Sequence, residues 1–141
     1  MAHAAPIKPD DAHFARTRLL ALENTISGKP VSRKFMEEAL ALDPTYPELQ
    51  VALGAAYEQV GLFKQAIDFM ERAAAIYGTH PLVQAFLGST YASANETDKA
   101  YEVIATLDRL AQNRFVPSVC WAIIYMSLKD ERAFEYLKTA A

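Results

Sequence analysis

Apolar residues recur along most of this chain at helical spacing, and they also follow a longer period of 34 residues. Each period opens with a large apolar residue, a small residue and a tyrosine three positions later: Leu53, Gly54 and Tyr57, then Leu87, Gly88 and Tyr91, then Trp121, Ala122 and Tyr125. Residues three and four positions apart share one face of a helix, so each group predicts a helix with one buried face. A fixed period of this length predicts stacked copies of one helical unit.

A second helix is predicted in the latter half of each unit, where an alanine precedes a large apolar residue by four positions. These pairs are Ala66 and Met70, Ala100 and Ile104, and Ala133 and Leu137. Pro47, Pro81 and Pro117 open the units as helix breaks. A glycine inside a helix costs about 1 kcal/mol relative to alanine, so its repeated use predicts that another helix backbone comes close there. The alanines are expected to fill the facing positions, and the tyrosine hydroxyls are expected to lie near a partner or water.

This order of residues resembles the tetratricopeptide repeat, a helix–turn–helix unit of 34 residues, over about residues 30–141. The resemblance implies an all-α, right-handed solenoid of about eight antiparallel helices in three to four pairs. A flexible arm is expected at residues 1–8, followed by one domain over 9–141 with units at about 9–46, 47–80, 81–116 and 117–141. The leading unit is divergent, and its first helix is predicted from the helical spacing of Phe14, Leu19, Leu22 and Ile26. A turn is expected over residues 27–30.

Composition narrows the class of protein further. The 141 residues are 52% hydrophobic, which excludes an intrinsically disordered chain, and 14 basic against 17 acidic residues argue against nucleic-acid binding. The sequence contains neither an apolar run of 18 residues nor the pattern of a secretory signal, so no membrane span and a cytoplasmic location are predicted. A single cysteine, Cys120, excludes a disulfide framework.

Residues that could support catalysis are few and scattered. His3, His13 and His80 fall in an arm, a divergent helix and a turn, without the paired spacing that a metal site on one helix face needs. Cys120 has no histidine near it in sequence and is interpreted as a structural thiol. We therefore predict no catalytic residue, no metal and no cofactor.

The resemblance implies a concave groove lined by the first helix of each unit, with protein or peptide partners. Its predicted lining residues are Val51, Ala55, Glu58, Leu82, Phe86, Ser89, Ile123 and Met126. One subclass of the family grips chaperone tails with Lys, Asn and Arg, and the apolar residues here argue against that clamp. A groove of this kind favours an amphipathic helix or a segment of the protein itself. The alternative, that these residues merely cover one another, stays open.

The function predicted is a non-catalytic protein–protein interaction module, such as an adaptor, an assembly factor or a regulatory domain. The alternative is a structural subunit of a larger complex or homo-oligomer, because no capping helix follows the third unit. Self-association or a partner contact is then expected at Phe134, Tyr136 and Leu137.

Overall fold

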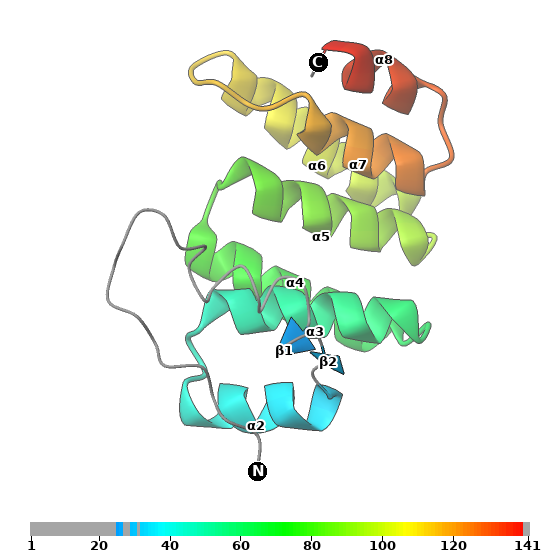
Figure 1. The fold of residues 1–141 in the computed structure, drawn as a ribbon. Coiled ribbons are helices and arrows are strands. Elements are labelled where there is room, and N and C mark those ends of the chain that lie inside the picture. Colours follow the sequence, from blue (N-terminus) through cyan, green and yellow to red (C-terminus); the bar gives the residue numbers. More distant parts are fainter. Residues whose placement is uncertain (1–24, 27–28, 31, 140–141) are drawn as a thin grey trace.

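The computed structural model describes residues 25–26, 29–30 and 32–139, and this part of the chain is helical except for one short strand pair (Figure 1). Its helices are α2 (Arg33–Leu42), α3 (Pro47–Gln59), α4 (Phe63–Tyr77), α5 (Pro81–Ser93), α6 (Thr97–Ala111), α7 (Val119–Ser127) and α8 (Arg132–Thr139). The all-α helical repeat that the sequence predicts is confirmed, whereas the handedness of the solenoid stays a prediction.

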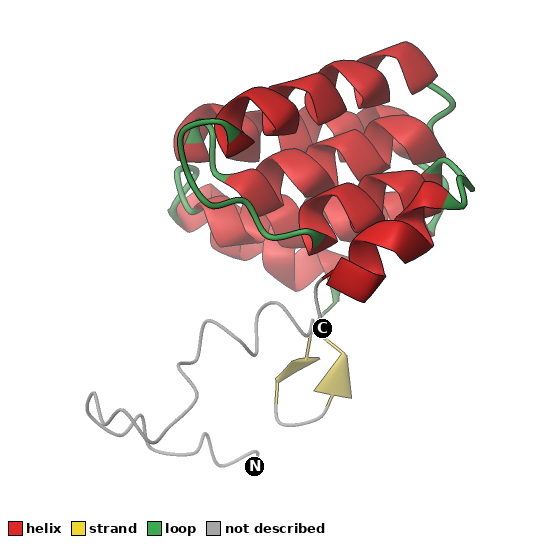
Figure 2. Cartoon of the chain, turned by 90° about the horizontal axis from the view of Figure 1, so that it is seen from above, coloured by secondary structure: helices red, strands yellow, loops and turns green. Residues whose placement is uncertain are grey.

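The strand pair corrects one expectation about the leading unit. Strand β1 (Thr25–Ile26) pairs antiparallel with β2 (Lys29–Pro30), so Ile26 does not belong to a helix. Two β-branched residues followed by a short connection with a glycine favour extended backbone and a turn over helix. The pair lies beside the helical stack (Figure 2). The other residues of the predicted first helix, and the predicted arm at 1–8, lie outside the described residues.

The described helices form an inner and an outer layer. Inner helix α5 contacts α3 on one side and α7 on the other, whereas α2, α4, α6 and α8 contact inner helices and not one another. Side-by-side inner helices and separated outer helices give the stack a concave and a convex face. We call the packing of α2 against α3 the first junction, and that of α4 against α5 the second junction.

Small residues allow the helices to approach, as the period predicts. Ala66, Ala100 and Ala133 are all buried in their predicted positions. The expectation of a close helix backbone at the two helical glycines is wrong, because the neighbours are side chains. A Cβ on Gly54 would lie 3.0 Å from Cγ and Cε of Met70, and one on Gly88 would lie 2.7 Å from Cδ1 of Ile124.

Each helix pair is closed by the same turn, which the period did not reveal. Gly61, Asn95 and Lys129 stand 34 residues apart, and all three have positive φ angles of 75°, 66° and 57°. In each turn the residue that follows donates its backbone N–H to the carbonyl oxygen of the signature tyrosine at 2.9 Å. This left-handed closure of a helix C-terminus suits glycine best and tolerates asparagine. Lysine at the third turn is the unfavourable case.

Candidate functional site

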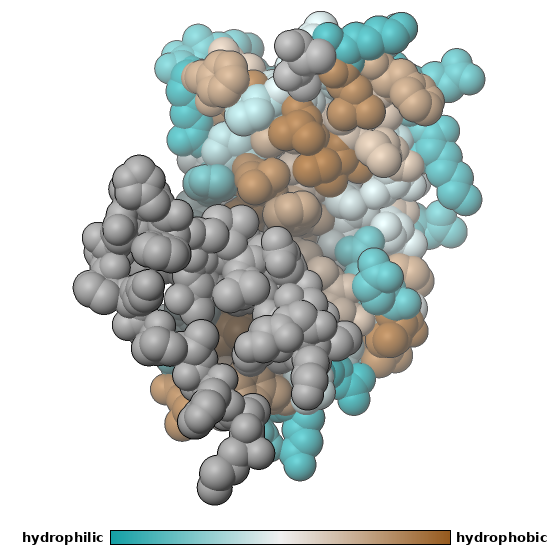
Figure 3. All heavy atoms as spheres, viewed as in Figure 1, coloured by the Kyte–Doolittle hydropathy of each residue, from teal (hydrophilic) through white to brown (hydrophobic). Residues whose placement is uncertain are grey.

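The inner helices carry almost no charge. Helices α5 and α7 contain no Asp, Glu, Lys or Arg, and α3 contains only Glu48 and Glu58. The outer helices, in contrast, each carry acidic and basic residues and have a polar and an apolar side. The concave face is therefore the apolar face of the stack. Figure 3 shows hydrophobic side chains gathered on this side over α5 and α7.

Three of the predicted groove residues meet in one hollow between α3 and α5. The hollow has a volume of about 200 Å³, and Val51, Leu82 and Phe86 line it. Its other lining residues are Glu48, Tyr77, His80 and Val83. Val51 is buried and Phe86 is half-buried against the core, while Leu82 is 39% exposed. Leu82 is thus the most accessible of the three predicted apolar residues in this hollow.

The remaining predicted groove residues differ in accessibility. Met126 is 60% exposed and Ala55 is exposed, so both are available to a partner. Ile123 is half-buried against the core. The hydroxyl of Ser89 lies 2.7 Å from that of Ser127 and links α5 to α7.

Glu58 links the other pair of inner helices. Its Oε2 accepts a hydrogen bond of 2.9 Å from the hydroxyl of Thr90, which is fully buried. Part of the predicted set therefore holds the inner layer together, and Leu82, Ala55 and Met126 form its accessible part.

The signature tyrosines of α3 and α5 tie these inner helices to the preceding outer helix, whereas the hydroxyl of Tyr125 in α7 accepts from Arg132 of the following helix α8. Tyr57 donates its hydroxyl to Glu37 at 2.5 Å, and Tyr91 donates to Glu71 at 2.7 Å. The bond to Glu37, followed by burial, raises the pKa of Tyr57. Burial, followed by the bond to Glu71, raises the pKa of Tyr91. The sequence predicts a hydroxyl partner without naming it, although Glu37 and Glu71 stand 34 residues apart and could have indicated it.

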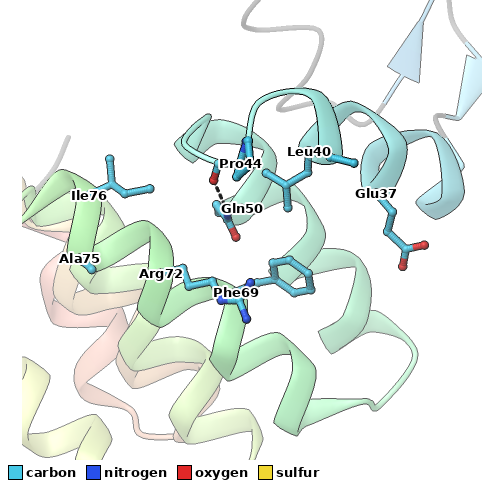
Figure 4. A pocket seen from close by; sticks show the side chains of 9 residues that line it. Glu37, Leu40, Pro44, Gln50, Phe69, Arg72, Ala75 and Ile76 are labelled. Atoms are coloured by element: carbon cyan, nitrogen blue, oxygen red, sulfur yellow. Dashed lines mark hydrogen bonds between the residues drawn. The ribbon is translucent and has the colours of Figure 1, made fainter.

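A second and larger hollow opens on the convex side between α2 and α4, and the period gave no sign of it. Its volume is about 690 Å³, and its lining residues are Glu37, Leu40, Ala41, Pro44, Gln50, Phe69, Arg72, Ala75 and Ile76 (Figure 4). Gln50 is 3% exposed; its Nε2 donates to the carbonyl oxygen of Pro44 at 3.0 Å, while its Oε1 has no partner. The charged groups at this hollow are already paired, Glu37 with Arg33 and Arg72 with Asp68. A polar partner there would have to replace these pairs.

The predicted C-terminal contact divides between two sides of α8. Phe134 is 65% exposed and Leu137 is also exposed. Tyr136 instead stacks on Trp121 and Tyr125, with ring centroids 5.5 and 5.6 Å away. Phe134 and Leu137 can therefore contact another chain, whereas Tyr136 contributes to the packing of α8 on α7.

The chemistry of the described residues gives little basis for catalysis. Among them, no group of three or more His, Cys, Asp and Glu side chains converges on a possible metal position. Cys120 is fully buried, and burial raises the pKa of its thiol, which disfavours the reactive thiolate. The longest helices in this part of the chain have 15 residues, and none is long and apolar enough to cross a membrane.

Two layers of paired helices with an apolar inner face define a helical-repeat protein. A family model, "Tetratricopeptide repeat", matches residues 33–87, which run from α2 into α5. Residues 33–87 therefore match the tetratricopeptide repeat, as the signature residues predict. Repeats of this family are in general protein–protein interaction modules and not catalysts.

Comparison with curated proteins finds one short similarity. The chain is 61% identical over 36 residues to the low specificity L-threonine aldolase of Escherichia coli strain K12, and 58% identical over 36 residues to that of strain O157:H7. Each match covers 26% of this chain and 11% of the aldolase. The chain thus spans about a tenth of the length of these enzymes, too little to carry their activity over. No solved structure matches the chain significantly.

Proposed function

We propose that this chain is a non-catalytic adaptor, assembly factor or regulatory module that binds an amphipathic helix in the groove of α3, α5 and α7. The observation that carries the proposal is the absence of charge from α5 and α7, although Leu82 and Met126 are exposed on them. Contiguous exposed apolar surface marks contact sites on soluble domains. A helix with apolar residues at i, i+3, i+4 and i+7 would cover such a groove. A cytoplasmic location is part of this proposal.

The test uses the accessible groove residues, because changing them leaves the core intact. The probe is a synthetic amphipathic peptide with leucines at i, i+3, i+4 and i+7, and its binding is followed by fluorescence anisotropy. We expect the double variant Leu82→Ser and Met126→Ser to bind at least tenfold more weakly, because apolar anchors dominate interface energies. Its melting temperature should stay close to that of the unchanged protein.

The matched control is Leu42→Ser, since Leu42 is exposed on the outer helix α2. It removes a leucine away from the groove and should leave peptide binding unchanged. Equal affinities of the unchanged protein and the groove double variant would refute the proposed groove. Phe86→Ser is a poorer probe, because Phe86 packs against the core and its loss would lower stability as well.

A structural role through α8 is the second candidate, favoured by the exposure of Phe134 and Leu137. It predicts self-association that Phe134→Glu with Leu137→Glu abolishes in light scattering. A protein that is monomeric before the substitutions would rule out the homo-oligomer.

A further inference from the structure

The charge on the inner helices has one sign and lies along one edge. Glu48 and Glu58 are the only charged residues of α3, α5 and α7, and both belong to α3. Ten residues of α-helix separate them, or about 15 Å at 1.5 Å per residue. Glu48 lines the hollow beside Leu82 and Phe86. Glu58 lies against α5 through its hydrogen bond to Thr90.

Neither carboxylate is neutralised by the described part of the chain. The ion pairs of residues 32–139 all lie on the outer helices or in the turns before them: Arg33–Glu37, Lys34–Glu38, Arg72–Asp68, Lys99–Glu96 and Arg132–Asp130. The described basic residues all lie outside α3, α5 and α7. His80 and Tyr77 line the hollow together with Glu48 and are the other titratable groups of its lining. In the described part of the chain, α3 therefore borders the apolar surface with negative charge. The guanidinium of Arg114, which donates to the carbonyl oxygen of Thr79, is the basic group at the turn before α5.

We propose that the groove selects a basic amphipathic helix, an inference that rests on the proposed function and names the partner of that same groove. The apolar stripe of this helix covers α5 and α7 around Leu82. Lysine or arginine residues about three turns apart on one flank meet Glu48 and Glu58. Their long aliphatic stems add apolar contact while their charged ends stay near water. Charge of this kind sets the choice of partner and the rate of association more than the total affinity.

The experiment compares three labelled peptides that share one leucine stripe and differ at two flank positions, eleven residues apart. These positions hold lysine, glutamine or glutamate, and affinities are measured by anisotropy at low and at physiological salt. We expect the lysine peptide to bind about tenfold more tightly than the glutamate peptide at low salt, which corresponds to about 1.4 kcal/mol, because lysine forms two surface ion pairs where glutamate meets two like charges. At physiological salt the difference in affinity between the lysine and glutamate peptides should be smaller, because the ions screen surface charges.

Variants of the protein locate the effect. Glu48→Gln with Glu58→Gln should bring the lysine and glutamate peptides to similar affinities, and glutamine at position 58 can still accept from Thr90. The matched control is Asp98→Asn with Glu102→Gln, which removes two exposed charges from outer helix α6 and should leave the difference intact. Circular dichroism verifies that all variants keep their helix content.

The possible results separate this inference from the proposed groove. Equal binding of all three peptides, with loss of binding in the Leu82 and Met126 double variant, overturns the choice of a basic partner and leaves the groove standing. A difference that persists in the Glu48 and Glu58 double variant also overturns it. If none of the three peptides binds, the groove and the basic partner fail together.

Discussion

Tyr57 and Tyr91 occupy equivalent positions in the first and second junctions, and their surroundings differ. Each donates a hydrogen bond to a glutamate twenty residues earlier, and each lies beneath a cation, Arg33 at 5.2 Å and Lys99 at 5.0 Å from the ring centroid. Tyr91, however, is 8% exposed, whereas Tyr57 is only half-buried. The hydrogen bond to glutamate is thus the same at both junctions. The cation comes from the preceding outer helix at Tyr57 and from the following outer helix at Tyr91, and the depth of burial also differs.

The glycines before these tyrosines show where the difference arises. The three atoms nearest to a Cβ placed on Gly54 all belong to the flexible side chain of Met70. The three nearest to a Cβ on Gly88 belong to the branched side chains of Ile124 and Val103. Ile124 belongs to α7, so the second junction is also packed from the following unit. A repeat motif therefore determines local hydrogen bonds, and the neighbouring units determine how tightly its helices pack.

The largest expected difference comes from adding one methyl group at each glycine. Gly88→Ala places a Cβ 2.7 Å from Ile124 and 3.0 Å from Val103, and it should destabilise by about 1–3 kcal/mol. Gly54→Ala meets only Met70, which can move, and alanine gains about 1 kcal/mol of helix propensity. The urea midpoint of Gly54→Ala should therefore stay near that of the unchanged protein. Similar losses in both variants would contradict the difference in packing.

A smaller effect, of opposite sign, is expected in the third turn. Lys129 has a φ of 57° at the position where the first turn has Gly61. A side chain in this conformation costs about 1–2 kcal/mol, which glycine would relieve. Part of this gain is lost, because glycine gives up more backbone entropy on folding than other residues do. Lys129→Gly should therefore stabilise by about 0.5–1 kcal/mol in urea unfolding. Lys129→Ala removes the same charge and retains the strain, so a gain of the same size from alanine would refute this explanation.

These turns also show what the sequence could and could not predict. Gly61 and Asn95 are residues typical of a left-handed position, but Lys129 carries no such sign, and only its distance of 34 from Asn95 indicates the turn. Helix pairing and the buried alanines were predictable because each depends on local spacing. The β1–β2 pair was missed because the helical spacing of apolar residues up to Ile26 continued into residues that favour extended backbone.

Accessibility within the groove was less predictable than the fold. The resemblance to the repeat family places Val51, Phe86 and Met126 in one groove, yet only Met126 among them is exposed. How far each side chain is covered depends on the next inner helix, which local periodicity does not describe. The convex hollow at Gln50 depends in the same way on the separation of α2 and α4.

The smallest expected effect is a difference in alkaline stability between the two junctions. Both tyrosines have pKa values raised above the ordinary value of 10, so above about pH 10 the unfolded chain loses these protons while the folded protein keeps them. The unfolded state binds fewer protons above pH 10, so raising the pH stabilises it relative to the folded state. The free energy of unfolding should therefore be unaffected below pH 10 and should decrease above it.

Tyr91→Phe should remove more of this decrease than Tyr57→Phe, because burial is the first cause of the raised pKa at Tyr91 and Tyr57 remains half-buried. Urea unfolding at about pH 9, 10 and 11 measures the slope for each variant. Equal slopes in the two variants would show that the hydrogen bond to glutamate, which both junctions share, governs the titration and that burial does not.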